Sequence, residues 1–174
     1  MASASLAKFS ELLRHQLYEC NDQLIPLDKE IAYLENFIEL EKLRQNQGLM
    51  VELDLGRAYQ PDIGIAPFIL MTFVENAFKH VSKDKDRPNW IQIALSVSGA
   101  QLHFAVSNST SGYESSDVVN YGGIGLKNVQ RRLDLIYPGQ YQLDIQGDQD
   151  TFLVKLDLQL SAITVNPSIQ LITE

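Results

Sequence analysis

The spacing of apolar residues divides the first part of the chain into two helical stretches. Apolar positions three and four apart recur over residues 6–20 and again over residues 27–38, which predicts two amphipathic helices. The first stripe is narrow and suits a seam between two helices. Pro26 introduces the second helix, and Gly48 follows its end.

From Leu49 onward, apolar residues alternate singly with polar ones. A period of two predicts half-buried β-strands, here over LMVELDL, WIQIALSV, QLHFAVS, YQLDIQG and TFLVKLDLQL. Two further helices are predicted between strands, one starting near Pro67 and one over IGLKNVQRRLDLIYPG. This order predicts an α/β sandwich, in which helices cover one face of a mixed, largely antiparallel β-sheet.

The composition of the chain argues against several kinds of partner and binding site. The 174 residues carry a net charge of −8, which argues against nucleic acid because phosphate-backbone binding needs clustered Lys and Arg. No apolar run reaches the ~18 residues of a membrane span, and the first residues do not resemble a signal peptide. The single cysteine, Cys20, excludes an internal disulfide and a cysteine-rich zinc site. We therefore expect a cytoplasmic domain.

The helix predicted after Pro67 contains polar residues inside an apolar pattern. In FVENAFKH, the side chains of Asn76, Lys79 and His80 fall within one sector of the helix. The apolar side can then face the sheet while this sector faces a cavity. The alternative is an amphipathic surface helix whose polar side is simply hydrated.

A glycine-rich stretch, YGGIGLKNV, precedes and opens the last predicted helix. Gly122, Gly123 and Gly125 allow the backbone to approach a ligand, and the amides and partial positive charge of a helix start attract phosphate. Such glycines also occur simply at the ends of loops. The polar segment before them, SNSTSGYESSDVVN, has no periodicity and is predicted to be a loop.

The order of these motifs resembles the ATP-binding domain of histidine kinases, whose superfamily includes gyrase and MutL. ENAFKH is similar to the N-box of that domain, and VSN and GIGL are similar to its two glycine boxes. LLRHQLYEC, IPLDKEIAYLENFIELEKLRQ and GIGLKNVQRRLDLIYPGQYQLDI are similar to sensor kinases of the LytS/YehU type. The resemblance implies a Bergerat ATP-binding fold over residues 25–160. Residues 1–24 would be a remnant of the dimerisation hairpin, and 161–174 a loosely attached tail.

The resemblance implies ATP and Mg²⁺ as cofactors and assigns roles to residues of the predicted polar helix. Asn76 would bind Mg²⁺ through its amide oxygen, since this cation prefers oxygen ligands. Glu75 would position a water or the metal shell and is the first choice for a general base. Lys79 and His80 would lie beside the phosphates and offset their charge.

The resemblance also implies contacts from outside that helix. The glycine-rich segment would wrap the phosphates through Gly122, Gly123, Gly125 and the amides of Leu126 and Lys127. Thr151 matches a threonine that helps to hold the adenine. Asn108 stands where many superfamily members have an aspartate that accepts the adenine amino hydrogen. As a neutral group, the asparagine should accept it more weakly.

The implied function is transfer of the γ-phosphate of Mg-ATP to a histidine outside this fragment, because the chain lacks the NPHFLFN-like acceptor motif. We interpret His15 and His103 as surface residues. The implied partners are the phosphoacceptor helix, a response regulator, and a second copy in a homodimeric parent anchored in the inner membrane. Two alternatives remain open: a protein-serine kinase of the same superfamily, and a non-catalytic dimerisation scaffold.

Overall fold

The computed structural model describes residues 24–45, 48–56, 62–111 and 124–163. The helix predicted over residues 6–20, which contains His15 and Cys20, lies outside these ranges. Gly122, Gly123, most of the predicted loop and most of the tail also lie outside them.

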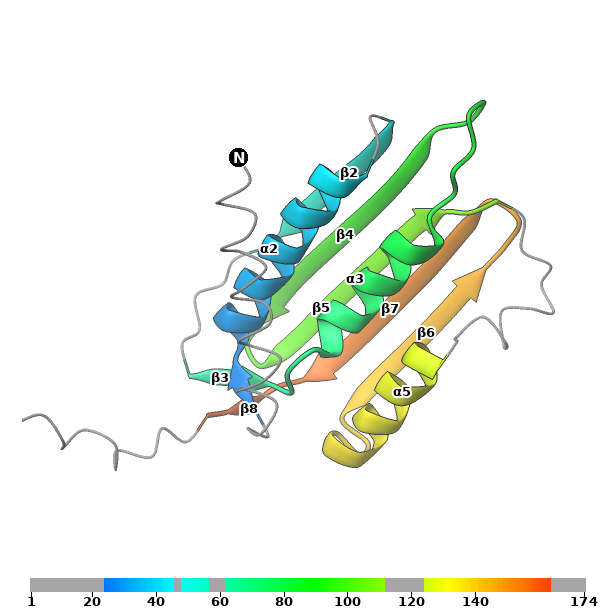
Figure 1. The fold of residues 1–174 in the computed structure, drawn as a ribbon. Helices are drawn as coiled ribbons and strands as arrows, with labels where there is room; N and C mark the ends of the chain where they lie inside the picture. Colours follow the sequence, from blue (N-terminus) through cyan, green and yellow to red (C-terminus); the bar gives the residue numbers. More distant parts are fainter. Residues whose placement is uncertain (1–23, 46–47, 57–61, 112–123, 164–174) are drawn as a thin grey trace, which may run out of the picture.

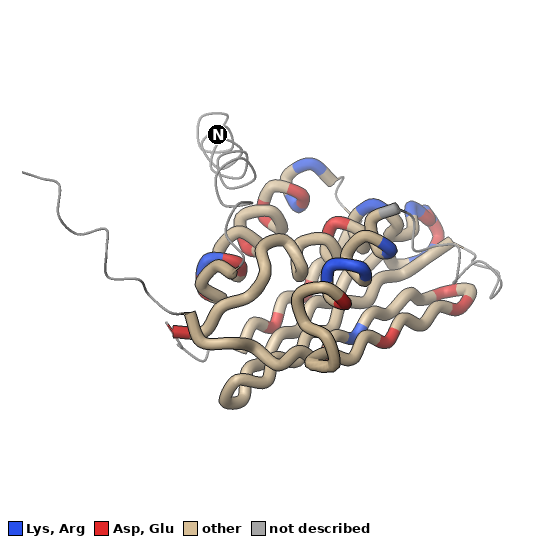
Figure 2. Tube along the Cα trace, turned by 90° about the horizontal axis from the view of Figure 1, so that it is seen from below, with Lys and Arg blue, Asp and Glu red and all other residues tan. Residues whose placement is uncertain are grey.

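Helices cover one face of a five-stranded sheet in the described part of the chain (Figures 1 and 2). The strand order is β2-β4-β5-β7-β6, with β2 and β4 parallel and the other neighbouring pairs antiparallel. The strands are β2 (Leu49–Leu55), β4 (Asn89–Ser98), β5 (Gln101–Ser109), β6 (Tyr141–Gly147) and β7 (Thr151–Gln159), and the helices are α2 (Leu27–Arg44), α3 (Ile69–His80) and α5 (Ile124–Ile136). The predicted α/β sandwich with a mixed, largely antiparallel sheet is confirmed.

The core lies between the sheet and the helices. Alternate residues of β4 and β5 point into it, and the predicted apolar face of α2 packs above them; the buried set includes Leu27, Ile31, Leu34, Ile38, Ile91, Ile93, Leu95, Leu102, Phe104 and Val106. Full burial of one such side chain stabilises the fold by about 1.5–3 kcal/mol. The period-two pattern therefore marks the strand residues that face the helices, and the period-3.6 pattern marks the helix residues that face the sheet.

Helix α3 begins later than the sequence pattern predicts. Pro67 was expected in the first turn, but the helix starts at Ile69. Phe68 has φ 64°, in the left-handed region, so the chain cannot become helical before it. The carbonyl of Phe68 nevertheless accepts the first helical bond from the amide of Thr72 at 3.2 Å.

A second, three-stranded sheet was not predicted. Its strands are β1 (Ile25–Pro26), β3 (Ile63–Ile65) and β8 (Ser161–Ala162), all antiparallel in the order β1-β3-β8. The segment expected to be a loose tail from residue 161 is thus paired with β3 at its first two residues. Gly64 is required at the centre, because a Cβ there would come within 2.5 Å of Ile163 Cγ1.

A buried carboxyl group joins α2 to the start of α3. Glu30 of α2 is fully buried, and its Oε2 accepts the N–H of Phe68 at 3.1 Å. Burial raises the pKa of Glu30 from 4.5 to about 7, although the nearby amide of Phe68 opposes this rise. On the other side, the hydroxyl oxygen of Tyr137 accepts the N–H of Ala66 at 2.7 Å.

The raised pKa of Glu30 predicts that stability falls as pH rises. The folded state holds this proton more tightly than the unfolded chain does, so the stabilisation is complete below the unfolded pKa of 4.5 and is lost as pH rises through about 7. Between about pH 5 and about pH 8, the wild-type free energy of unfolding should fall by roughly 2 kcal/mol relative to that of Glu30→Gln. Denaturant titrations of both proteins across this range measure the difference, and parallel pH profiles would contradict it.

Candidate functional site

The polar sector of α3 lies opposite its buried face. Ile69, Leu70, Met71, Phe73, Val74, Ala77 and Phe78 are buried. The ring of Phe73 lies 6.3 Å from that of Phe104 on β5, and the ring of Phe78 lies 5.9 Å from that of Phe37 on α2. This packing fixes the rotation of the helix. Glu75 and Lys79 are consequently exposed, while Asn76 and His80 are half-buried.

The two basic residues of this sector differ in charge. Partial burial, and secondly the neighbouring charge of Lys79, lower the pKa of His80 from 6.5. His80 is therefore mainly neutral at pH 7, and Lys79 is the cation that the sector offers to an anionic ligand.

Asn108, near the end of β5, has a buried acceptor atom without a partner. The residue is 1% exposed, and its Nδ2 donates to the carbonyl of Ser109 at 3.0 Å. Its Oδ1 is buried and accepts no hydrogen bond from the described residues. Leaving such an atom unpaired costs about 1–3 kcal/mol, so it marks a place where a donor from a ligand or water is expected.

A hydrogen-bonded latch holds the end of α3 beside the end of β5. The amide of Ser82, just after the helix, donates to the carbonyl of Ser109 at 2.8 Å, and the two hydroxyl oxygens lie 3.2 Å apart. The Ser82 hydroxyl also donates to Asn89 Oδ1, and the amide of Trp90 donates to the Ser109 hydroxyl at 3.0 Å. The latch therefore brings the helix end that carries Lys79 and His80 to the strand end that carries Asn108.

The start of α5 supplies the described part of the predicted glycine-rich segment. Helix α5 packs against α3. Gly125 and Lys127 are exposed, whereas Leu126 is buried and its side chain belongs to the core. A Cβ added at Gly125 would meet no atom of the described residues within 4 Å. No close packing among the described residues requires glycine at this position, and none of them fills the space beside Gly125.

The structure does not bring Thr151 to Asn108. Along β7 the buried residues alternate from Phe152, which is paired with Asn108, so Thr151 falls on the other face of the sheet. Its amide and its hydroxyl both donate to Asp148 Oδ1, at 2.7 and 2.8 Å. These bonds, the hydroxyl bond first, hold the pKa of Asp148 below its usual range. Thr151 thus shapes the turn before β7, because one residue of register decides which face it occupies.

This turn also anchors the segment that leads away from β5. The amide of Thr110 donates to the carbonyl of Asp150 at 2.8 Å, and its hydroxyl donates to the carbonyl of Gln149 at 3.2 Å. Sequence reasoning missed this contact and the Ser82–Ser109 latch, since single polar residues at element ends carry no periodic signal. It also missed Glu30, because an acid in an amphipathic helix is typical of a surface.

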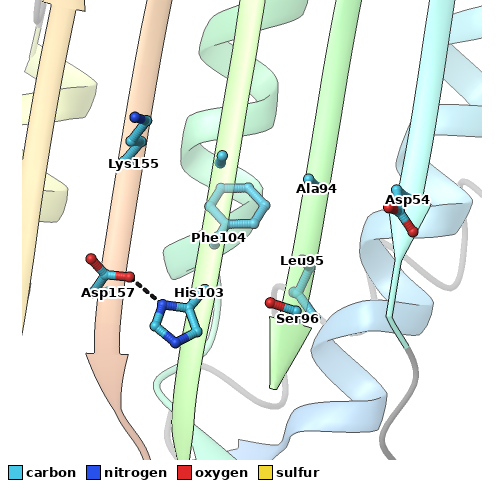
Figure 3. A pocket seen from close by; sticks show the side chains of 9 residues that line it. Asp54, Ala94, Leu95, Ser96, His103, Phe104, Lys155 and Asp157 are labelled. Atoms are coloured by element: carbon cyan, nitrogen blue, oxygen red, sulfur yellow. Dashed lines mark hydrogen bonds and ion pairs between the residues drawn. The ribbon is translucent and has the colours of Figure 1, made fainter. Parts of the chain in front are cut away.

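A hollow of about 260 Å³ lies on the helix-free face of the sheet, and none of the residues predicted for the nucleotide site lines it (Figure 3). There His103 Nδ1 and Asp157 Oδ1 lie 2.5 Å apart, and both side chains are about half exposed. The interpretation of His103 as a surface residue is confirmed. Within the described ranges, no three His, Cys, Asp or Glu side chains are grouped to hold a metal ion.

Comparison with solved structures defines the class of fold. The histidine kinase domain of the blue-light activated histidine kinase of Erythrobacter litoralis matches with a TM-score of 0.58 and 19% identity, over 89% of this chain and 74% of that chain. The catalytic domain of histidine kinase ThkA matches with a TM-score of 0.54 and 13% identity, over 78% of this chain and 93% of that chain. The fold is that of a histidine kinase catalytic domain.

Comparison of sequences finds similarity to LytS sensor proteins. The chain is 29% identical over 161 residues to the sensor protein LytS of Streptococcus mutans, and 28% identical over 153 residues to that of Staphylococcus saprophyticus. These alignments cover 86% and 82% of this chain but only 27% and 26% of the relatives' length. A family model described as histidine kinase matches residues 1–49. The predicted resemblance to LytS-type sensor kinases is confirmed.

The position of Thr151 allows a test of whether this residue belongs to the ATP site that the sequence predicts. In Thr151→Val, the hydroxyl bond to Asp148 is lost while the amide bond remains. We expect the melting temperature to fall by only about 2 °C and the affinity for ATP to stay within about twofold of wild type. Calorimetry of the variant measures both. A loss of affinity of about tenfold would show that Thr151 reaches the adenine after all.

Proposed function

We propose that this chain is the ATP-binding catalytic domain of a sensor histidine kinase, which presents the γ-phosphate of Mg-ATP to a histidine outside the chain. The observation that carries the proposal is the buried, unpartnered Oδ1 of Asn108 beside the polar end of α3. The resemblance to LytS proteins supports it. None of the similar proteins named above favours the serine-kinase or scaffold alternative.

The chemistry of Asn108 fits adenine better than guanine. Because Nδ2 is already bound to the Ser109 carbonyl, the amide offers its oxygen, an acceptor, to a ligand. The exocyclic amino group of adenine is a donor, whereas guanine has a carbonyl at the corresponding ring position. An acceptor facing a carbonyl would leave both groups unpaired, so we propose that the site prefers ATP to GTP.

The phosphates would lie between α3 and the start of α5. Lys79 and Lys127 are exposed cations on these two helices, and the first amides of α5 add donors and partial positive charge. The open space over Gly125 fits a close approach of phosphate oxygens to the backbone. Gly122 and Gly123 would extend this cradle.

The residues present also fit a magnesium ion shared with a nucleotide. The half-buried amide of Asn76 offers one neutral oxygen ligand from the middle of the polar sector, and phosphate oxygens would supply others. When bound, Mg²⁺ neutralises phosphate charge. Glu75, the exposed neighbour of Asn76, would orient a water of this shell, while neutral His80 would offer a hydrogen bond rather than a charge.

The wider role of the chain is part of the same proposal. The acceptor histidine, a response regulator and a second copy of the kinase would be the partners, and the catalytic contribution of this chain would be orientation and charge neutralisation of the phosphates. None of the described helices is long and apolar enough to cross a membrane.

A change at Asn108 should move stability and affinity in opposite directions. Asn108→Leu removes the unpaired Oδ1 and keeps a similar volume, and the Ser109 carbonyl still accepts the Ser82 amide. We expect an unchanged or higher free energy of unfolding, with ATP affinity reduced by about tenfold or more. Calorimetric titration with ATP and with GTP, with and without Mg²⁺, tests this. Wild-type chain that binds neither nucleotide would refute the proposed function.

A change at Asn76 tests the metal ligand. Asn76→Ala should abolish the magnesium-dependent part of ATP binding with little loss of stability, because the side chain is outside the core. Gln92→Ala is the matched control, since it removes an exposed amide from the helix-free face, where Gln92 donates to Glu52. Unchanged magnesium dependence in Asn76→Ala would rule out this ligand.

A further inference from the structure

We propose that Glu30 is a positioning residue for the nucleotide site: from α2, its carboxyl group accepts a hydrogen bond from the start of α3 and holds in place the helix that carries the polar sector. The inference rests on the proposed function of α3. It assigns a role to a residue that lies at the opposite end of α3 from Lys79 and His80.

Helix α3 cannot cap its own N-terminus. The residue at the cap position is Phe68, no side chain of the segment itself bonds to the free amides, and the first turn contains no acid. The first four amides of a helix lack partners within it, and a buried start needs an acceptor from elsewhere. Phe68 is also held in the left-handed region, a conformation that persists only where the surroundings enforce it.

Glu30 supplies this acceptor from another helix. Its Oε2 accepts the Phe68 amide at 3.1 Å, and the Glu30 side chain itself is fully buried. The amides of Leu70 and Met71 lie close enough to lower the pKa of Glu30, although only the Phe68 amide has hydrogen-bond geometry. Its other carboxyl oxygen, Oε1, is buried and has no hydrogen-bond partner among the described residues.

The neighbourhood makes the cap a junction of three helices. The Tyr137 hydroxyl, just after α5, accepts the Ala66 amide, and Glu30 of α2 accepts the Phe68 amide. The short segment between β3 and α3 is therefore hydrogen-bonded to residues from both α2 and the end of α5. Arg132 and Tyr137 are the charged and titratable groups that act on Glu30 from α5 and its end, and the first turn of α3 contributes no titratable side chain.

This junction links α2 mechanically to the proposed nucleotide site. Helix α3 is rigidly latched at its other end to β5, so a displaced start would tilt Asn76 and Lys79 relative to Asn108. The family model that matches residues 1–49 includes α2. A displacement of α2 would therefore be transmitted to the nucleotide site through the Glu30 carboxyl group.

Glu30→Gln tests the proposal, and Glu41→Gln is the matched control. Glutamine keeps the size of the side chain but replaces one of the two carboxyl oxygens with an amide nitrogen, which can only donate. Glu41 is also a buried acid of α2, but it pairs with Arg44 of the same helix at 2.9 Å. We expect amide hydrogen exchange over residues 68–72 to become about tenfold faster in Glu30→Gln, and the dissociation constant of Mg-ATP to rise about fivefold. Glu41→Gln should change neither quantity.

The outcomes separate this inference from the proposed function. Faster exchange with unchanged ATP affinity would make Glu30 a structural cap only and overturn the inference, as would unchanged exchange. A wild-type chain that binds no Mg-ATP overturns the proposed function, and the inference falls with it. If Glu30→Gln does not fold, Glu30→Asp replaces it, since aspartate keeps the carboxyl group on a shorter side chain. Faster amide exchange over residues 68–72 and a higher dissociation constant for Mg-ATP are then expected of Glu30→Asp.

Discussion

The burial of one side of α3 between the sheet, α2 and α5 is the constraint on which the rest of the arrangement depends. Each large apolar side chain on that side contributes about 1.5–3 kcal/mol when fully buried, so the helix cannot rotate without losing most of the core contacts it makes. With the rotation fixed, Asn76 and Lys79 can point in only one direction. The Ser82–Ser109 latch then sets how far that polar sector lies from Asn108.

Buried polar atoms that lack a hydrogen-bond partner lie at the two ends of α3. In the described part of the chain, the buried side-chain atoms without a partner are Glu30 Oε1 at the start of α3 and Asn108 Oδ1 beside its end. The left-handed non-glycine residue, Phe68, lies at the start as well. Most of the other buried side chains are apolar, and local exceptions of this kind are expected where a protein binds or positions something.

Periodicity allowed the main sheet, α2 and α5 to be predicted, because half-buried strands and amphipathic helices repeat the same contact several times. The polar sector of α3 was also predictable, since three residues shared one face. The face of the sheet on which Thr151 lies could not be predicted in this way. Strands have a period of two, so a shift of one residue in register moves a side chain to the other face. Strands of two or three residues, such as β1 and β8, have no period at all. An acid in an amphipathic helix is typical of a surface, so nothing in the sequence distinguished Glu30.

The most direct test of the central claim, that the polar side of α3 and Asn108 form one nucleotide site, is a nuclear magnetic resonance titration of the isotope-labelled chain with Mg-ATP. We expect the largest shift changes on the amides of Asn76 and Lys79 and on the side-chain amide of Asn108. His103 and Asp157, on the opposite face of the sheet, should remain unchanged. Shifts centred on that opposite face, or no shifts at saturating nucleotide, would contradict the account.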